Sequence, residues 1–238
     1  MNQNFQCLTY KGKGNSLISL KGKTKDLFKQ FDSFVRVSTC QRIEIYSEKN
    51  LSSLEDMNKL DFPDSMIHLI EVLSGVDSGL FGEIEVYLQI KESLKTAKKE
   101  KHLSSELGNL FSQAFEISDN IREKFELNNS WANSIEEVIS KRKNIFIFGD
   151  GNLAKSLEKN LSSKGFNFLD NPKNAEAIVI LKKGFKPSNK TAKIINLTEE
   201  EFKHDVINMS KFFTKPDKKI INAIKEEIKK ELSNPRRK

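Results

Sequence analysis

The chain has 238 residues, of which 37% are hydrophobic and 31% charged, and its formal net charge is +7. This length allows one large domain or two small ones, each with its own core. Two isolated cysteines without a CxxC pair exclude a disulfide framework and a cysteine metal site, and no apolar run approaches the roughly 20 residues of a membrane span.

The excess of lysine admits two interpretations. A basic surface suits a polyanion such as RNA, because lysines displace phosphate counterions. A solvated, lysine-rich surface balanced by glutamates is the simpler interpretation, since charge alone does not define a partner. The polar start, MNQNF, lacks the features of a signal peptide, so we expect a cytoplasmic protein with reduced thiols.

The N-terminal part predicts strands around a short helix. Residues 4–10 read as a strand in which Cys7 is a small buried hydrophobe, and a helix is expected near residues 24–31. Residues 34–48, FVRVSTCQRIEIYSE, predict a strand pair with one buried apolar face and one more polar face, because side chains alternate along a strand. The expected apolar set is Val35, Val37, Ile43 and Ile45, and the polar set is Cys40, Arg42, Glu44 and Tyr46.

Three helices and a joining segment follow. The run from Pro63 to Gly75 predicts a helix with proline in its first turn. Residues 84–97 carry an imperfect helical stripe, and residues 103–125 show the clearest amphipathic pattern of the chain. Residues 128–143 join the two halves as a loop and a short helix.

The second half changes character at residue 144. A strand, NIFIF, leads through a glycine turn into a helix, and the short strands NFLD, EAIVILKK and AKIINL follow. This order suggests a parallel sheet of nucleotide-binding type, and an amphipathic helix closes the chain. The predicted fold is an α+β N-terminal domain followed by an abbreviated α/β Rossmann-like nucleotide-binding domain.

Two segments of the first half carry candidate chemistry. Arg42 would favour the thiolate of Cys40, and its planar fork suits a carboxylate. His68 lies within IHLIEVL, where a histidine is either functional or a satisfied core residue. Residues 74–83, SGVDSGLFGE, either shape a polar pocket or form an ordinary capped loop.

A glycine turn in the second half suggests a nucleotide site. Gly149, Gly151 and Ala154 fit the pattern G-x-G-x-x-G/A after a strand and before a helix. Glycine there lets a pyrophosphate approach backbone amides at the helix N-terminus, although Asp150 is slightly unfavourable beside phosphates. The expected cofactor-binding residues are Gly149, Asp150, Gly151, Asn152, Leu153 and Ala154.

Together these segments resemble the glutamyl-tRNA reductase family. The family's S-T-C-N-R-T-E-x-Y appears here as STCQRIEIY, and its H-L-x-x-V-x-S-G-L-D-S-x-x-x-G-E-P-Q motif as HLIEVLSGVDSGLFGEIE. The resemblance implies NADPH-dependent reduction of glutamyl-tRNA(Glu) to glutamate-1-semialdehyde, the first step of five-carbon tetrapyrrole (porphyrin) biosynthesis. It implies a catalytic domain at 1–127, a linker helix at 128–143, an NADPH-binding Rossmann-like domain at 144–215, and a C-terminal helix and basic tail at 216–238.

The resemblance also assigns residues. Cys40 is the nucleophile that forms a thioester, and His68 protonates the departing tRNA hydroxyl or tunes Cys40. The residues expected around the glutamyl group are Thr39, Gln41, Arg42, Ser78, Glu83, Ile84, Glu85 and Gln89. No metal is implied, and the downstream glutamate-1-semialdehyde aminomutase is a candidate partner. The oligomeric state is left open, because the family's dimerisation bundle is missing except for one helix.

Departures from the family pattern keep two alternatives open. Gln41 replaces Asn, Ile84-Glu85 replace Pro-Gln, and the nucleotide-binding domain is abbreviated. One alternative is a non-reducing relative that binds glutamyl-tRNA or acts as a regulatory or scaffold protein of the same pathway, and the other is a generic RNA-binding module. Asp170 and Lys173 follow the second strand of the nucleotide-binding domain, so we expect NADPH with weak discrimination against NADH.

Overall fold

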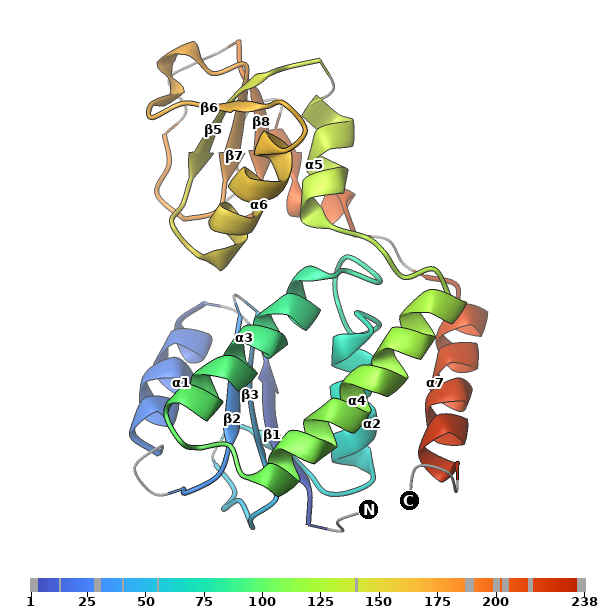
Figure 1. The fold of residues 1–238 in the computed structure, drawn as a ribbon. Coiled ribbons are helices and arrows are strands. Elements are labelled where there is room, and N and C mark those ends of the chain that lie inside the picture. The colour runs from blue at the N-terminus through green and yellow to red at the C-terminus, as the bar shows by residue number, and fades with distance from the viewer. Residues whose placement is uncertain are drawn as a thin grey trace. The chain divides into compact units, whose positions relative to one another are not determined.

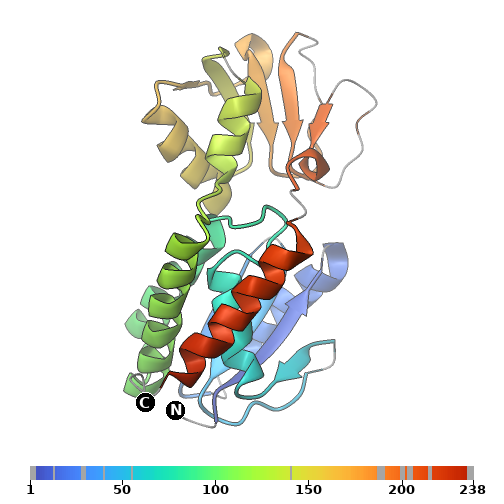
Figure 2. The same cartoon turned by 90° about the vertical axis from the view of Figure 1, so that its right-hand side faces the viewer.

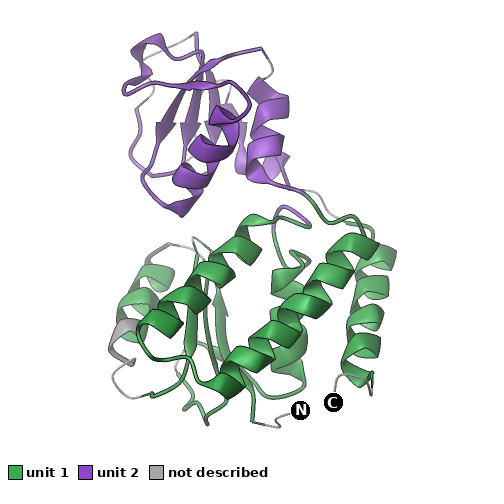
Figure 3. Ribbon diagram, viewed as in Figure 1, with its two compact units in different colours: residues 1–78, 82–128, 216–238 green, residues 79–81, 129–215 purple. Residues whose placement is uncertain are grey.

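The computed structural model describes residues 4–12, 14–27, 31–39, 41–54, 56–139, 141–186, 191–198, 202, 206–213 and 216–234 (Figure 1). The chain divides into two compact units (Figure 3). Unit 1 comprises residues 1–78, 82–128 and 216–238, and unit 2 comprises residues 79–81 and 129–215. Each unit therefore contains segments that are distant in the sequence.

Unit 1 is built on an antiparallel sheet with the strand order β2-β3-β1-β4. Its strands are β1 (Gln6–Lys11), β2 (Val35–Ser38), β3 (Arg42–Ser47) and β4 (Asn58–Leu60). The β2–β3 hairpin pairs Val35 with Tyr46 and Val37 with Glu44. Directly opposed residues share a face, so the predicted grouping of both valines with Ile43 and Ile45 is wrong. The turn between the strands resets the alternation that a continuous strand would keep.

Both faces of this sheet are buried. On one face Leu8, Ile43 and Ile45 pack with Leu17 and Leu20 of helix α1 (Gly14–Leu27). The sequence placed this helix about ten residues too late, and residues 28–30 of the predicted span lie outside the described part of the chain.

The opposite face of the sheet carries aromatic contacts. The ring of Tyr46 stacks on Phe5 at 5.9 Å and meets Phe111 edge-on at 5.5 Å between centroids. Cys7 is fully buried, as predicted. The expected polar face of the hairpin is therefore an interior in which Arg42 and Glu44 are also buried.

Helices α2, α3, α4 and α7 complete unit 1. They span Asp64–Leu73, Glu85–Lys99, Ser105–Lys124 and Lys218–Ser233. The predicted helix at residues 103–125 is confirmed as α4, and the hydroxyl of Ser104 caps it by accepting from the backbone N–H of Leu107 at 3.0 Å. Helix α7 contacts α2 and α4 (Figure 2) and buries Ile224 and Ile228. The C-terminal segment is thus part of unit 1.

Unit 2 is a parallel five-stranded sheet with the order β6-β5-β7-β8-β9. The strands are β5 (Asn144–Phe148), β6 (Asn167–Phe168), β7 (Ala177–Ile180), β8 (Lys193–Asn196) and β9 (Val206–Asn208). The expected parallel sheet is present, and three-residue β9 is a strand that the sequence did not predict. Numbered from β5, the order is 2-1-3-4-5, which is found in doubly wound sheets.

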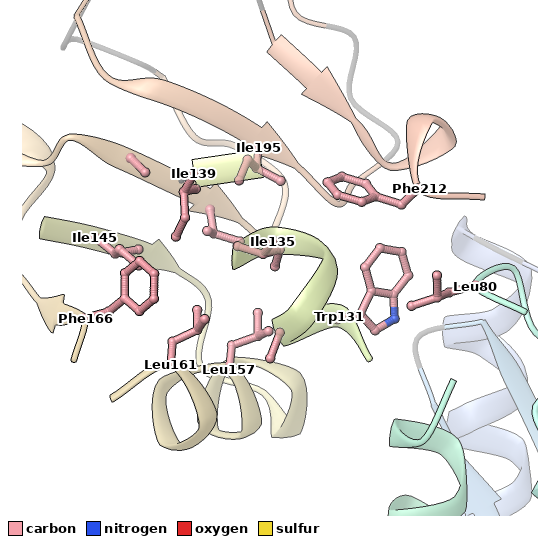
Figure 4. Close-up of a cluster of buried hydrophobic side chains, with 13 residues drawn as sticks. Leu80, Trp131, Ile135, Ile139, Ile145, Leu157, Leu161, Phe166, Ile195 and Phe212 are labelled. Atoms are coloured by element: carbon pink, nitrogen blue, oxygen red, sulfur yellow. The ribbon is translucent and has the colours of Figure 1, made fainter. Parts of the chain in front are cut away.

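The core of unit 2 is formed by helices α5 (Trp131–Ile139) and α6 (Asn152–Ser162) against the sheet. Figure 4 shows Ile135 and Ile139 of α5 near Leu157 and Leu161 of α6 and Ile195 of β8. The helix predicted as a linker is therefore a core element of this unit. None of the helices in the described part of the chain is long and apolar enough to cross a bilayer.

Candidate active site

Thr39 follows β2 and shapes the turn that leads into β3. The hydroxyl oxygen of Thr39 accepts from the backbone N–H of Gln41 at 3.1 Å and from that of Arg42 at 3.2 Å. The N–H of Thr39 donates to the carbonyl of Arg42 at 3.0 Å. Thr39 therefore stabilises the turn with its side chain. Cys40 lies outside the described residues, and its role stays a prediction.

Arg42 is held by two carboxylates inside unit 1. Its side chain is only 3% exposed. Nη1 donates to Glu44 Oε1 at 3.2 Å and to Asp77 Oδ2 at 3.1 Å, and Nη2 donates to the backbone carbonyl of Asp77 at 2.7 Å. Burial by itself lowers the pKa of Arg42, but the charges of Glu44 and Asp77 outweigh it and raise that pKa. The guanidinium is therefore a permanent cation.

Three of the five guanidinium N–H groups of Arg42 are used in these contacts. Within the described part of the chain, the remaining two, one on Nε and one on Nη2, make no hydrogen bond. Together they form the side edge of the guanidinium, which matches a carboxylate in two-point geometry. The structure thus holds Arg42 by one edge, and the other edge makes no hydrogen bond among the described residues.

Glu44 links Arg42 to His68. Glu44 Oε1 lies 2.9 Å from His68 Nε2, and Oε2 accepts from the hydroxyl of Tyr46 at 2.8 Å. Burial alone would raise the pKa of Glu44, but hydrogen bonds from His68 and Tyr46 and the charge of Arg42 lower it to about 2. Glu44 is ionised near neutral pH and accepts from three partners. The sequence showed this glutamate in the family motif, but it did not single out its role.

His68 is oriented by this buried carboxylate. An ionised carboxylate only accepts hydrogen bonds, so Nε2 carries the proton that faces Glu44. Nδ1 is then the nitrogen that remains for chemistry. The side chain is 16% exposed, which gives solvent or a ligand access to the ring. The sequence left His68 between a functional and a core role, and a functional role stays a prediction.

The loop at residues 74–83 is closed by a glycine contact. Gly75 has a φ of +73°, and a Cβ there would lie 2.7 Å from the backbone nitrogen of Glu83. The N–H of Gly82 donates to the carbonyl of Gly75 at 2.9 Å. Glycine is required at position 75 both by this backbone conformation and by the close approach.

Arg122 of α4 fastens the ends of this loop. Its side chain is buried and donates to the carbonyls of Leu73 at 2.9 Å, Gly82 at 3.1 Å and Glu83 at 2.5 Å. Sequence reasoning did not identify Arg122, because an arginine late in an amphipathic helix is usually a solvated residue. It is a structural anchor for the loop.

Two of the predicted substrate-binding residues have buried oxygens that lack a partner. Ser78 Oγ and Gln89 Oε1 make no hydrogen bond among the described residues. A buried polar atom without a partner is costly unless a ligand or water satisfies it. Of the other predicted residues, Glu83 and Glu85 are buried and Ile84 is partly exposed.

The glycine turn of unit 2 follows β5. Gly149 has a φ of +154°, and a Cβ there would lie 2.8 Å from Leu181 Cβ, just after β7. Gly151 caps α6 and faces open space. Asp150 and Asn152 are exposed, Leu153 is partly buried, and Ala154 is buried. The turn lies where the order of strands reverses, between β5 and β7, which is the usual ligand crevice of such sheets.

These features define a class of two-unit α/β protein: one unit carries a buried arginine–glutamate–histidine cluster, and the other a parallel sheet with a glycine turn. Residues 15–125 match the family model described as "Glutamyl-tRNAGlu reductase, N-terminal domain". Over these residues the chain is similar to the glutamyl-tRNA reductase family, as the motifs predicted.

Two of the similar proteins come from Methanococcus aeolicus and Thermoplasma acidophilum. Glutamyl-tRNA reductase of Methanococcus aeolicus is 27% identical over 195 residues, which cover 76% of this chain and 49% of that protein. The enzyme of Thermoplasma acidophilum is 30% identical over 139 residues, 55% of this chain and 34% of that protein. The chain thus spans about half the length or less of the curated relatives it matches.

A solved structure shares the fold. Glutamyl-tRNA reductase from Methanopyrus kandleri aligns with a TM-score of 0.50 and 18% identity, covering 82% of this chain and 50% of that one. At this identity the likeness concerns the fold alone.

Proposed function

We propose that the protein reduces glutamyl-tRNA(Glu) to glutamate-1-semialdehyde with NADPH, the first step of five-carbon tetrapyrrole biosynthesis. The observation that carries this proposal is the cluster of Arg42, Glu44 and His68 next to the hairpin turn of the Ser-Thr-Cys motif. It combines a carboxylate-binding cation with an oriented proton donor. The match of residues 15–125 to the family model and the names of the relatives support the same reaction.

The first chemical step is acyl transfer to Cys40. Its thiolate attacks the ester carbonyl, a carbon–sulfur bond forms, and the bond between that carbon and the ribose oxygen of the tRNA breaks. Nδ1 of His68 takes the thiol proton of Cys40 and then gives it to the departing oxygen, while Glu44 keeps Nε2 protonated. The free edge of Arg42 holds the side-chain carboxylate of the glutamyl group.

The residues of unit 2 fit a dinucleotide. Gly149 lets the turn approach β7 closely, and Gly151 leaves the N-terminus of α6 open to a phosphate. NADPH bound there would supply the hydride for the proposed reduction. Asp170 disfavours a 2′-phosphate and Lys173 attracts one, so we propose weak discrimination against NADH.

The test is a reaction of the purified protein with glutamyl-tRNA and NADPH, followed by semialdehyde formation and NADPH oxidation. Cys40→Ser is expected to abolish both signals while retaining tRNA binding. Cys7→Ser is the matched control, since burial raises the pKa of the Cys7 thiol well above its ordinary value and keeps it unreactive. Wild-type protein that binds glutamyl-tRNA without reducing it would instead support the non-reducing alternative.

A further inference from the structure

Lys11 and Arg42 lie at the same end of neighbouring strands. They are register partners in β1 and β3, so their side chains leave the same face of the sheet. Lys11 Nζ is 2.7 Å from both the backbone carbonyl and Oδ1 of Asp77. Arg42 contacts Oδ2 and the same carbonyl. Asp77 therefore receives four hydrogen bonds from two cations.

The charges of this cluster balance only when Lys11 is included. Arg42 and Lys11 are cations, and Glu44 and Asp77 are anions, with His68 bonded to Glu44. Without Lys11 the other three charged residues would sum to one negative charge. An anionic ligand that approaches the free edge of Arg42 would then meet net repulsion instead of a neutral cluster.

We propose that Lys11 determines the specificity of this site by cancelling the charge of Asp77, so that Arg42 prefers a ligand carboxylate over a neutral amide. The inference rests on the proposed function in one respect, that the ligand is a glutamyl group. Lys11 is 48% exposed, so its effect is partly screened by solvent. One charge roughly 8 Å from the ligand changes affinity roughly five-fold at an effective dielectric constant of about 40, and less at high salt.

Two small probes isolate this preference. Isoglutamine keeps the side-chain carboxylate of glutamate and has an α-amide, whereas glutaminamide is amidated at both positions. The dissociation constant of each is measured by NMR titration of the full chain. Wild type is expected to prefer isoglutamine, and Lys11→Met to lose roughly five-fold of that preference. Lys11→Met combined with Asp77→Asn is expected to recover most of it, because the charge balance returns.

Lys59→Met is the matched control. Lys59 lies in the same sheet and also faces an aspartate, Asp61, at 4.0 Å, and its loss should leave the preference unchanged. Amide spectra establish that each variant is folded. The inference is overturned if Lys11→Met prefers isoglutamine over glutaminamide as strongly as wild type does. It is also overturned if the double variant shows no stronger preference than Lys11→Met.

The outcomes separate this inference from the proposed function. A wild type that binds both probes equally overturns the specificity of Lys11 together with glutamyl recognition. A wild type that prefers isoglutamine, with Lys11→Met unchanged, overturns only the role of Lys11. If the double variant recovers the preference for isoglutamine but the wild-type protein does not reduce glutamyl-tRNA, the role of Lys11 is supported and the reductase proposal is overturned.

Discussion

The buried carboxylate of Glu44 gives the sharpest prediction about unit 1. Its pKa is about 2 in the folded protein, below the ordinary value of 4.5. The stabilisation that ionised Glu44 gives to the folded state is therefore fully present above pH 4.5, and it is lost as the pH falls through 2. The difference between the two values corresponds to about 3 kcal/mol at pH 7. Because Glu44 is fully buried, solvent screening does not reduce this magnitude.

Glu44→Gln removes the charge and keeps the shape. We expect it to lower the free energy of unfolding of unit 1 by about 3 kcal/mol at pH 7, with the difference from wild type shrinking between pH 4.5 and 2. Urea denaturation at several pH values measures it, with the amide signals of β3 as the probe, since Trp131, the sole tryptophan, lies in unit 2.

Glu92→Gln is the control for a surface carboxylate. Glu92 is 66% exposed and pairs with Lys95 on α3, so its loss should cost less than about 0.5 kcal/mol. Two results would refute the argument that Glu44 is buried as a hydrogen-bonded anion. One is a difference in the free energy of unfolding between Glu44→Gln and wild type below about 1 kcal/mol at pH 7. The other is a difference that stays constant between pH 5 and 2.5.

Three further predictions concern the site. Arg42→Lys should lower kcat/KM about 100-fold, because an ammonium lacks the planar fork of a guanidinium. A kcat/KM equal to that of wild type in steady-state kinetics would show that Arg42 does not bind the substrate. His68→Ala should slow thioester formation more than the later reduction, and single-turnover acylation without nicotinamide measures this; unchanged acylation would make His68 a structural residue. Gly149→Ala should destabilise unit 2 by about 1–3 kcal/mol, because its Cβ would lie 2.8 Å from Leu181 Cβ at positive φ. Gly151→Ala should keep the fold and weaken only NADPH binding. Thermal unfolding measures the first effect, and NADPH titration measures the second.

Local patterns in the sequence predicted much of the fold. The three- and four-residue steps of residues 103–125 correspond to α4, and the strand–turn–helix pattern after residue 144 corresponds to β5 and α6. These patterns work because backbone preference and side-chain periodicity are set within one element. The predicted faces of the hairpin are wrong, because the turn between β2 and β3 changes which side chains share a face.

The sequence by itself predicted the similarity to the glutamyl-tRNA reductase family and the candidate residues Arg42 and His68, because short motifs carry residue types at fixed spacing. Only the tertiary structure decided that Glu44 joins them, that Asp77 and Lys11 complete the charge balance, and that α7 returns to unit 1. Residues 11, 42 and 77 are far apart in the chain. Their meeting depends on the register of β1 with β3 and on where the loop after α2 packs. Neither is encoded in any single stretch of sequence, since both follow from how separate elements bury their surfaces together.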